Sequence, residues 1–230
     1  AAATNYRFTS TWMGVDDECV PPLRFGAVEP QMYRSAFPTS ESFEHLKLLK
    51  LQSVINLSQE TLSRTLSSFL QEQAISVFNV GLDVWTRLET NPVTHELICE
   101  ALQRLLDRMH HPVLIMSSSG SHQVGTVIGC LRRLQQWSLT AILSEYRAFA
   151  APTPRLWCEH FIEQFDVDLI SLPPQVPLWF EVQQQMLMAE QAEWGSTAPL
   201  SPERLAHFSI SGPLASPGTT TTLIDDPSQE

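Results

Sequence analysis

The chain has 230 residues, of which 43% are hydrophobic, and this length and composition suffice for one domain with a sizeable core. Its 14 basic and 25 acidic residues give a formal net charge of −11, which argues against binding to nucleic acid or to an anionic membrane surface. No apolar run approaches the roughly 18 residues that a membrane-spanning helix needs, so neither nucleic acid nor a membrane is expected as a partner.

The cysteines predict a reducing environment. Cys19, Cys99, Cys130 and Cys158 are widely spaced, and the chain has no Cys-x-x-Cys pair. Four reduced, mostly buried thiols are typical of an intracellular protein, and the amino end lacks the apolar core of a signal peptide. We therefore expect a cytoplasmic protein that needs no metal and no cofactor.

Composition divides the chain into four parts. Residues 1–19 are polar and aperiodic, which predicts a flexible arm, and residues 20–170 carry the patterns of a folded domain. Residues 171–194 predict a proline-containing linker followed by an amphipathic helix rich in Met and Gln. Residues 195–230 are rich in Ser, Thr, Pro and Gly and have few large apolar side chains, so we expect a disordered tail.

Within the folded part, helical and strand patterns alternate, as they do in α/β proteins. Capping residues, charge placement and apolar spacing delimit the individual elements. The predicted order is a helix over 38–50, a strand over 52–57, a helix over 58–73, a strand over 75–80 and a helix over 92–108.

The most informative stretch follows these elements. Val113–Met116 is an apolar run of the length expected for a buried parallel strand, and Ser117–Ser121 is a loop of small residues. Beyond His122, apolar residues recur at helical spacing. A strand, a small-residue loop and a helix start together form an anion cradle, because the loop amides and the helix dipole both present positive charge there.

This stretch resembles the signature loop of the cysteine-dependent phosphatases, His-Cys-x5-Arg-(Ser/Thr), and most of all that of the plant and fungal atypical dual-specificity phosphatases. The runs at Tyr33–Ser35, Trp137–Leu139 and Glu145–Arg147 are also similar to that family, and the resemblance covers about residues 20–170. It implies a single α/β domain with a central, mostly parallel sheet of four to five strands flanked by helices. Val113–Met116 should then lie near the middle of the sheet.

The loop departs from the family pattern at six positions, which are Met116, Ser117, Ser119, Ser121, Gln123 and Val124, and three of them bear most directly on catalysis. Ser117 stands where the family has its nucleophilic Cys, Gln123 where it has the phosphate-binding Arg, and Met116 where it has His. A serine hydroxyl is not ionised near neutral pH, whereas the family's thiolate is. These losses predict a pseudophosphatase that acts as a scaffold or regulatory subunit. By resemblance, its partners would be related phosphatase subunits in a hetero-oligomer, with phosphate or an inositol phosphate as a candidate ligand.

The alternative is an active phosphatase of the tyrosine, dual-specificity or inositol-pyrophosphate type. It would need Ser117 or a water molecule as a non-standard nucleophile, together with cations donated from outside the loop. Under either hypothesis the candidate phosphate-binding residues are Ser117, Ser118, Ser119, Gly120, Ser121, His122 and Gln123.

Several charged residues have two interpretations. Asp83 and Glu89 are each either a solvated loop charge or, by resemblance, a candidate for the general acid of a mobile loop. Arg34 is either a structural charge or an accessory residue near the active-site end. Arg132, Arg133 and Arg147 are either ordinary helix-surface charges or, by resemblance, helpers in holding polyphosphate.

Overall fold

A five-stranded sheet forms the centre of the protein in the computed structural model, which describes residues 19–83 and 93–196. The strand order is β1-β2-β5-β3-β4, with β1 antiparallel to β2 and every other pair parallel. The central position of β5 confirms the prediction for the apolar run that starts at Val113. The strands are β1 (Gly26–Glu29), β2 (Met32–Ala36), β3 (Ser53–Asn56), β4 (Ser76–Phe78) and β5 (Val113–Ser117).

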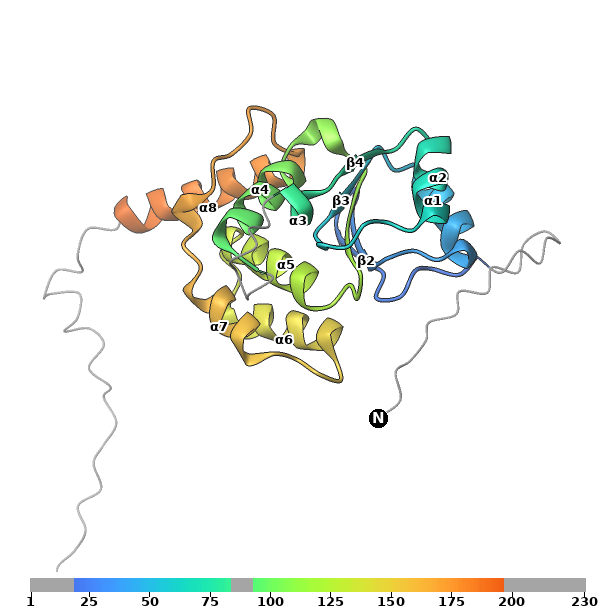
Figure 1. The fold of residues 1–230 in the computed structure, drawn as a ribbon. Helices are drawn as coiled ribbons and strands as arrows, with labels where there is room; N and C mark the ends of the chain where they lie inside the picture. The colour runs from blue at the N-terminus through green and yellow to red at the C-terminus, as the bar shows by residue number, and fades with distance from the viewer. Residues whose placement is uncertain (1–18, 84–92, 197–230) are drawn as a thin grey trace, which may run out of the picture. The chain divides into compact units, whose positions relative to one another are not determined.

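Helices cover both faces of the sheet, as the fold prediction required. Figure 1 shows α1 and α2 on one face and α4, α5, α6 and α7 on the other. The chain divides into two compact units, the first ending at Gln185 and the second beginning at Met186. The structure describes the second unit only as far as residue 196, where the last helix ends. The helices are α1 (Phe43–Leu49), α2 (Arg64–Glu72), α3 (Val80–Asp83), α4 (His95–Leu105), α5 (His122–Leu134), α6 (Leu139–Ala150), α7 (Leu156–Gln164) and α8 (Leu178–Ser196).

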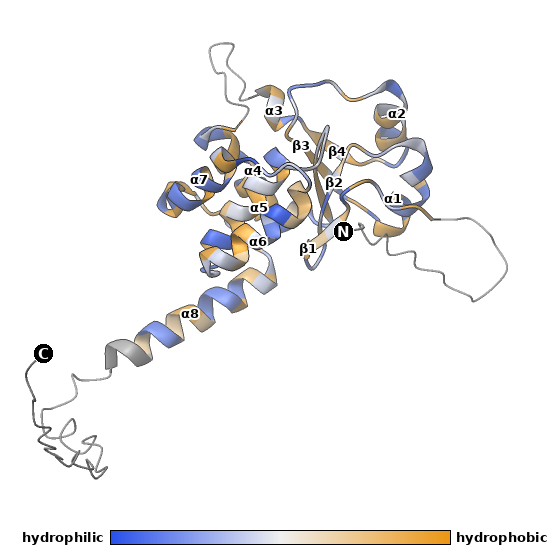
Figure 2. Ribbon diagram, turned by 90° about the horizontal axis from the view of Figure 1, so that it is seen from below, coloured by the Kyte–Doolittle hydropathy of each residue, from blue (hydrophilic) through white to orange (hydrophobic). Residues whose placement is uncertain are grey.

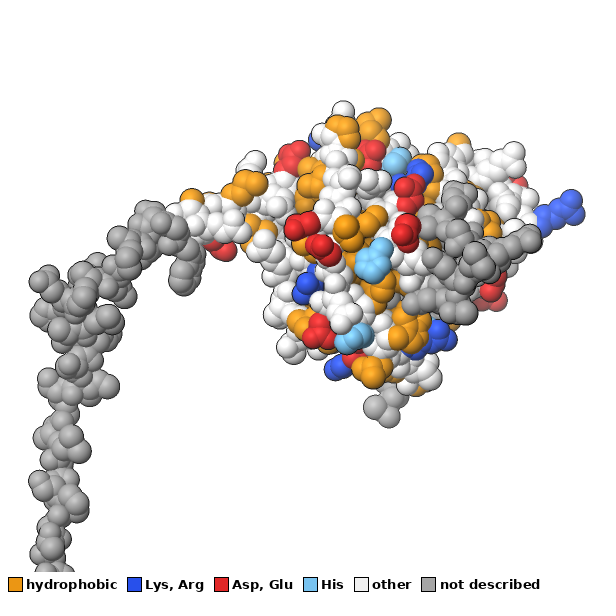
Figure 3. Space-filling view, turned by 60° about the vertical axis from the view of Figure 1, so that its left-hand side comes forward, with side chains coloured by type: hydrophobic (Ala, Val, Ile, Leu, Met, Phe, Trp, Pro, Cys, Tyr) orange, Lys and Arg blue, Asp and Glu red, His pale blue; other side chains and the backbone are white. Residues whose placement is uncertain are grey.

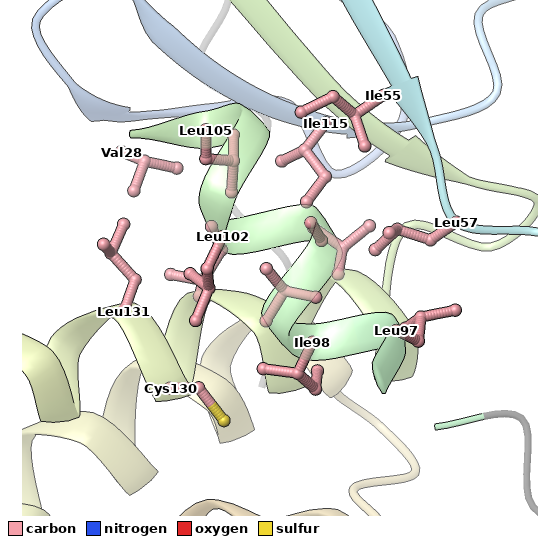
Figure 4. Close-up of a cluster of buried hydrophobic side chains, with 14 of the residues drawn as sticks. Val28, Ile55, Leu57, Leu97, Ile98, Leu102, Leu105, Ile115, Cys130 and Leu131 are labelled. Carbon is pink, nitrogen blue, oxygen red and sulfur yellow. The ribbon is translucent and has the colours of Figure 1, made fainter. Parts of the chain in front are cut away.

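The central strand explains its own unbroken apolar run. Successive side chains of a strand point to opposite faces, so Val113 and Ile115 enter one core while Leu114 and Met116 enter the other. Because helices cover both faces, no position along β5 faces water, and all five of its residues are buried. Figure 4 shows the larger core, where α4 and α5 pack against the sheet through Val28, Ile55, Leu57, Leu97, Ile98, Leu102, Leu105, Ile115, Cys130 and Leu131.

One helix boundary differs clearly from its prediction. The pattern over 58–73 predicted a helix from Ser58, but α2 begins at Arg64, after Ser63. Ser63 caps the helix, because its Oγ accepts from the N–H of Leu66 at 3.3 Å. Ser58 makes a contact across the fold instead, accepting from the N–H of Ser118 at 2.8 Å. A local capping pattern cannot register a partner 60 residues away.

The description of Arg132 as an ordinary helix-surface charge is wrong. Its side chain on α5 is almost fully buried and stacks over the ring of Trp137, with 4.2 Å from Cζ to the ring centroid. Burying a charge is costly unless it is paired, which explains the dense set of acceptors around this guanidinium. They lie on β1, on α6 and at the residue that follows α5, and they comprise the Glu29 carboxylate, the Glu145 carboxylate, the Gln135 side-chain oxygen and the Val28 carbonyl.

Polar, charged and apolar residues are mixed along the helices and on the surface. In Figure 2 the helices α2 and α8 alternate between hydrophilic and hydrophobic residues along their length. On the face drawn in Figure 3, acidic, basic and apolar side chains are interspersed. Among the helices within residues 19–83 and 93–196, none combines the length and the apolar character that crossing a membrane requires.

Candidate active site

The loop from Ser117 to Ser121 connects the central strand to α5. It leaves the carboxyl end of β5, which pairs in parallel with β2 on one side and β3 on the other. In open α/β sheets, ligands bind just outside the carboxyl ends of the strands, where neighbouring loops converge. The fold therefore places this loop where a ligand site is expected, at the amino end of a helix of 13 residues.

The loop is held compactly by its own groups. Gly120 has φ +65°, and a Cβ at this position would lie 2.3 Å from the backbone nitrogen of Ala36 on β2. Glycine is thus required both by the left-handed backbone and by the close approach. The N–H of Gly120 donates to Ser117 Oγ at 3.0 Å, and the N–H of Ser121 lies 3.4 Å from Ser119 Oγ.

The end of β3 supports the loop from one side. Ser118 donates its N–H to Ser58 Oγ, and Gln123 donates its side-chain amide to the Leu57 carbonyl at 2.9 Å. The amide of Gln123 is thus engaged at the end of β3, beside the start of α5. The Leu57–Ser58 turn contributes one side-chain acceptor and one carbonyl, and the sequence patterns did not reveal either of them.

His122, the first residue of α5, contacts a buried tyrosine. Its Nδ1 lies 3.2 Å from the hydroxyl oxygen of Tyr146 on α6, and that oxygen also accepts from the N–H of Arg155 at 3.1 Å. Burial lowers the pKa of His122 below its usual value, and the nearby charges of Arg155 and Arg24 lower it further. The imidazole is therefore neutral near pH 7. Burial is also the main cause that raises the pKa of Tyr146, so its hydroxyl stays protonated.

Two arginines from outside the loop bind its carbonyl groups. Arg24 donates from Nη1 to the Ser119 carbonyl at 2.9 Å, and Arg34 on β2 lies with Nη2 3.4 Å from the Gly120 carbonyl. Arg34 is only 1% exposed, and burial lowers its pKa to about 10, so it remains charged near neutral pH. The contact between Arg34 and the Gly120 carbonyl supports the hypothesis that Arg34 is an accessory residue of the site. Arg24 was missed, because nothing in the periodicity or spacing around it pointed to the loop.

Of the candidate general acids, Glu89 lies outside the residues that the structure describes. Asp83 is the last residue of α3, but its side chain lies outside the part of the chain that the structure describes, so its role as a general acid stays a prediction. Within residues 19–83 and 93–196, no group of three or more His, Cys, Asp or Glu side chains could hold a metal ion.

The fold and the loop define a phosphatase-like protein, and sequence comparison gives the family. Residues 19–183 match the model of the tyrosine phosphatase family, and the chain belongs to this family. Its relatives include plant, fungal and amoebal proteins, which confirms the resemblance to the plant and fungal atypical dual-specificity phosphatases.

Three relatives show how far the similarity extends. The chain is 39% identical over 160 residues to a probable tyrosine-protein phosphatase of Dictyostelium discoideum, covering 70% of this chain and 95% of that protein. It is 39% identical over 155 residues to the inositol diphosphatase DSP4 of Arabidopsis thaliana, covering 67% and 78% of the two chains. It is 36% identical over 170 residues to the inositol diphosphatase SIW14 of Saccharomyces cerevisiae, covering 74% of this chain and 60% of that protein.

A solved structure gives the same result. The catalytic domain of the yeast phosphatase SIW14, crystallised with citrate, aligns with a TM-score of 0.60 and 37% identity, over 65% of this chain and 90% of that chain. A second structure of the same catalytic core gives a TM-score of 0.61 at 34% identity, over 77% and 96%. The predicted fold class is therefore confirmed.

These comparisons correct the functional prediction. The substitutions at Ser117 and Gln123 predicted an inactive scaffold, but the relatives carry the names of inositol diphosphatases and tyrosine phosphatases. The findings favour the alternative, an active phosphatase. The prediction was wrong because it gave the groups lost from the loop more weight than the outside cations that the alternative required. The structure places two such cations, Arg24 and Arg34, against loop carbonyls.

Proposed function

We propose that this chain is a phosphatase that hydrolyses a phosphate group held in the Ser117–Gln123 loop, and that its substrates belong to the inositol diphosphate class. The observation that carries the proposal is the hydrogen bond from the N–H of Gly120 to Ser117 Oγ, at the junction of the central strand and α5. Loop amides and the amino end of a helix favour a bound phosphate, because both present partial positive charge. The relatives named inositol diphosphatases support the substrate class.

A substrate of this class carries dense negative charge, which a chain of net charge −11 repels unless cations are concentrated locally. The loop meets this requirement from outside its own sequence. Arg24 and Arg34 contact its carbonyls, and Arg155 lies close enough to lower the pKa of His122. These three arginines come from the β1 entry turn, from β2 and from the segment before α7.

The reaction consumes one water molecule. The bond between the terminal phosphorus and the bridging oxygen breaks, a new bond forms from phosphorus to the attacking oxygen, and orthophosphate is released. If Ser117 attacks, its hydroxyl proton passes to the departing inositol phosphate, and water then hydrolyses the phosphoserine, which releases orthophosphate and regenerates the hydroxyl. If water attacks directly, no covalent intermediate forms. The Gly120 N–H stabilises negative charge on Oγ, which favours Ser117.

Turnover will be slow compared with that of a thiolate enzyme, because a serine hydroxyl is far less ionised than a thiol near neutral pH. Ser117 is also fully buried at the end of β5, so a substrate must reach it between the loop and the neighbouring strand ends. When turnover is slow, a trace of a contaminating phosphatase can account for the phosphate released. Variants of the loop residues must therefore show that the activity belongs to this protein.

The test measures orthophosphate release by purified full-length protein from an inositol pyrophosphate, a phosphotyrosine peptide and an aryl phosphate. Ser117→Ala separates the two nucleophiles, since it abolishes turnover by serine and spares attack by water. His122→Ala reports whether turnover arises in this loop under either route. The matched control is Ser68→Ala on the exposed face of α2, which should leave the rate unchanged. Protein that binds phosphate but releases none from any of the three substrates would overturn the proposal.

A further inference from the structure

The orientation of the loop peptides depends on residues that lie outside the loop. A trans peptide is planar, so the carbonyl of one residue and the N–H of the next point in opposite directions. The peptide between Ser119 and Gly120 therefore has two fixed ends. Its carbonyl accepts from Arg24, and its N–H donates to Ser117 Oγ.

The next peptide shows the same arrangement. Its carbonyl, on Gly120, lies 3.4 Å from Nη2 of Arg34, and its N–H, on Ser121, faces Ser119 Oγ. Two consecutive carbonyls are thus held by two guanidinium groups on the outer side of the loop. The two N–H groups point the other way, where Gly120 donates to Ser117 Oγ and to the Ser117 carbonyl and Ser121 to Ser119 Oγ. Successive amides on one side of a loop are the geometry of a concave anion site, which a phosphate would enter by replacing these weak internal acceptors.

Both arginines are themselves fixed by one residue of α6. The carbonyl of Phe149 accepts from Arg24 Nε at 2.9 Å, and the guanidinium of Arg34 stacks on the Phe149 ring, with Cζ 3.8 Å from the centroid. Arg24 also lies with Nη2 3.3 Å from the carbonyl of Ala151, just past the end of α6. The carbonyls at a helix end carry partial negative charge, which holds a cation there.

Arg34 has donors to spare. Among the described residues, neither its Nε nor its Nη1 has a hydrogen-bond partner, although the side chain is almost fully buried. Burying unpaired donors and a charge is costly, so a structural role alone would favour an apolar residue here. The through-space attraction of a bound anion offsets that cost, because the interior screens charge weakly.

We propose that Arg24 and Arg34 are positioning residues that hold the Ser119 and Gly120 carbonyls outward, so that the N–H groups of Gly120 and Ser121 face the phosphate. This deepens the proposed function, on which it rests, by naming the groups that organise the phosphate site. The proposal also explains how positive charge reaches the phosphate site although the loop itself contains no arginine or lysine.

The first experiment measures binding of inorganic phosphate and of orthovanadate by calorimetry on the full-length protein. Arg24→Gln and Arg34→Met should each weaken binding about tenfold, less than the loss of a donor that touches the transition state. Arg34→Lys should restore part of the affinity, because it keeps the charge. Arg133→Gln is the control, since Arg133 also donates to a backbone carbonyl, that of Phe165, but at the far end of α5.

The second experiment does not depend on turnover. Replacing Ser117 by Cys places a thiol beside the Gly120 N–H, and its ionisation can be followed by ultraviolet difference absorbance against the parent chain. The Ser117→Cys thiol should ionise below the ordinary value of about 8.5. Adding Arg24→Gln frees the peptide and should raise that pKa, whereas adding Arg133→Gln should not.

The outcomes separate the two proposals. The positioning role would be overturned by equal thiol pKa values in the Arg24 and Arg133 variants together with equal phosphate affinities in the Arg24, Arg34 and Arg133 variants, whether or not the protein shows turnover. If the arginine variants show the expected loss of phosphate affinity and rise in thiol pKa but the parent protein hydrolyses no substrate, the proposed function is overturned and the positioning role stands. If Arg34→Met does not fold, Arg24→Gln and Arg34→Lys still decide the matter, because neither removes a buried side chain outright.

Discussion

The hydroxyl oxygen of Tyr146 lies 3.2 Å from Nδ1 of His122 and accepts the backbone N–H of Arg155 at 3.1 Å. One buried oxygen thus connects the first residue of α5 with the segment that leads into α7. This junction, and not the loop alone, determines where the imidazole lies relative to the phosphate site.

Tyr146→Phe should lower the free energy of unfolding by about 1 to 2 kcal/mol, because it leaves the Arg155 N–H without its acceptor. It should also release the His122 ring, which NMR would detect as a changed Nδ1 environment. Urea unfolding provides the stability measurement. Tyr33→Phe, on the partly exposed ring that stacks on Phe25, is the control and should change stability little.

Arg132→Met should destabilise the protein by about 3 kcal/mol or more, as expected when one partner of a buried ionic network is removed. The variant leaves the carboxylates of Glu29 and Glu145 near each other without the cation between them. Guanidinium unfolding measures the change. Arg147→Met removes a half-exposed arginine paired with Glu159, and its smaller loss serves as the comparison. Equal losses in the two variants would contradict the special place of Arg132.

Stability should fall as the pH drops below about 6.5, the ordinary histidine pKa. Burial lowers the pKa of His45, His111 and His122 in the folded protein, so below that pH the unfolded chain binds protons more readily than the folded one. Above it, both states carry neutral histidines and this contribution is constant. Urea unfolding at pH 7.5 and pH 5.5 tests the sign, and a higher stability at pH 5.5 would contradict it.

Gly81→Ala should disturb both the fold and the phosphate site. A Cβ at Gly81 would lie 2.2 Å from the Leu57 carbonyl oxygen and 2.6 Å from that of Ser58. Backbone atoms cannot rotate away, so overpacking should cost about 1 to 3 kcal/mol. Since Leu57 and Ser58 support the loop, phosphate affinity should also fall.

Gly129→Ala provides the matched control for this prediction. Its Cβ would lie 2.5 Å from Cδ1 and 2.8 Å from Cγ1 of the buried Ile162, so the variant disturbs packing away from the Leu57–Ser58 contact. Thermal unfolding should show a loss of stability in both variants, whereas phosphate calorimetry should show a loss of affinity in Gly81→Ala alone. A loss of affinity in Gly129→Ala as large as in Gly81→Ala would show that general destabilisation, and not the Leu57–Ser58 contact, is responsible.

The sequence predicted the fold well where neighbouring residues decide it. The run from Val113 to Met116 indicated a central strand because every residue in it packs, two into each core. The small-residue loop and the helix after His122 followed from local patterns in the same way.

The site was predicted only in part, because its supporting contacts join distant residues. Arg24 contacts Ser119, and Ser58 contacts Ser118, across separations of 95 and 60 residues that carry no periodic signal. The loss of Cys and Arg at positions 117 and 123 is visible in one sequence, whereas groups supplied from outside the loop are not. The related-subunit partners, the cytoplasmic location and the four-part division of the chain stay predictions.

The pairing of β5 on both sides has a consequence for the order in which the protein opens. From Val113 to Met116 each residue has a partner on β2 and another on β3, whereas β4 has only three residues and pairs with β3 alone. Local opening begins where the fewest contacts must break, so amide protons on β4 should exchange with solvent well before those on β5. Fraying of that edge leaves β2, β5 and β3 joined. The strand that precedes the Ser117–Ser121 loop is therefore among the last parts of the sheet to open.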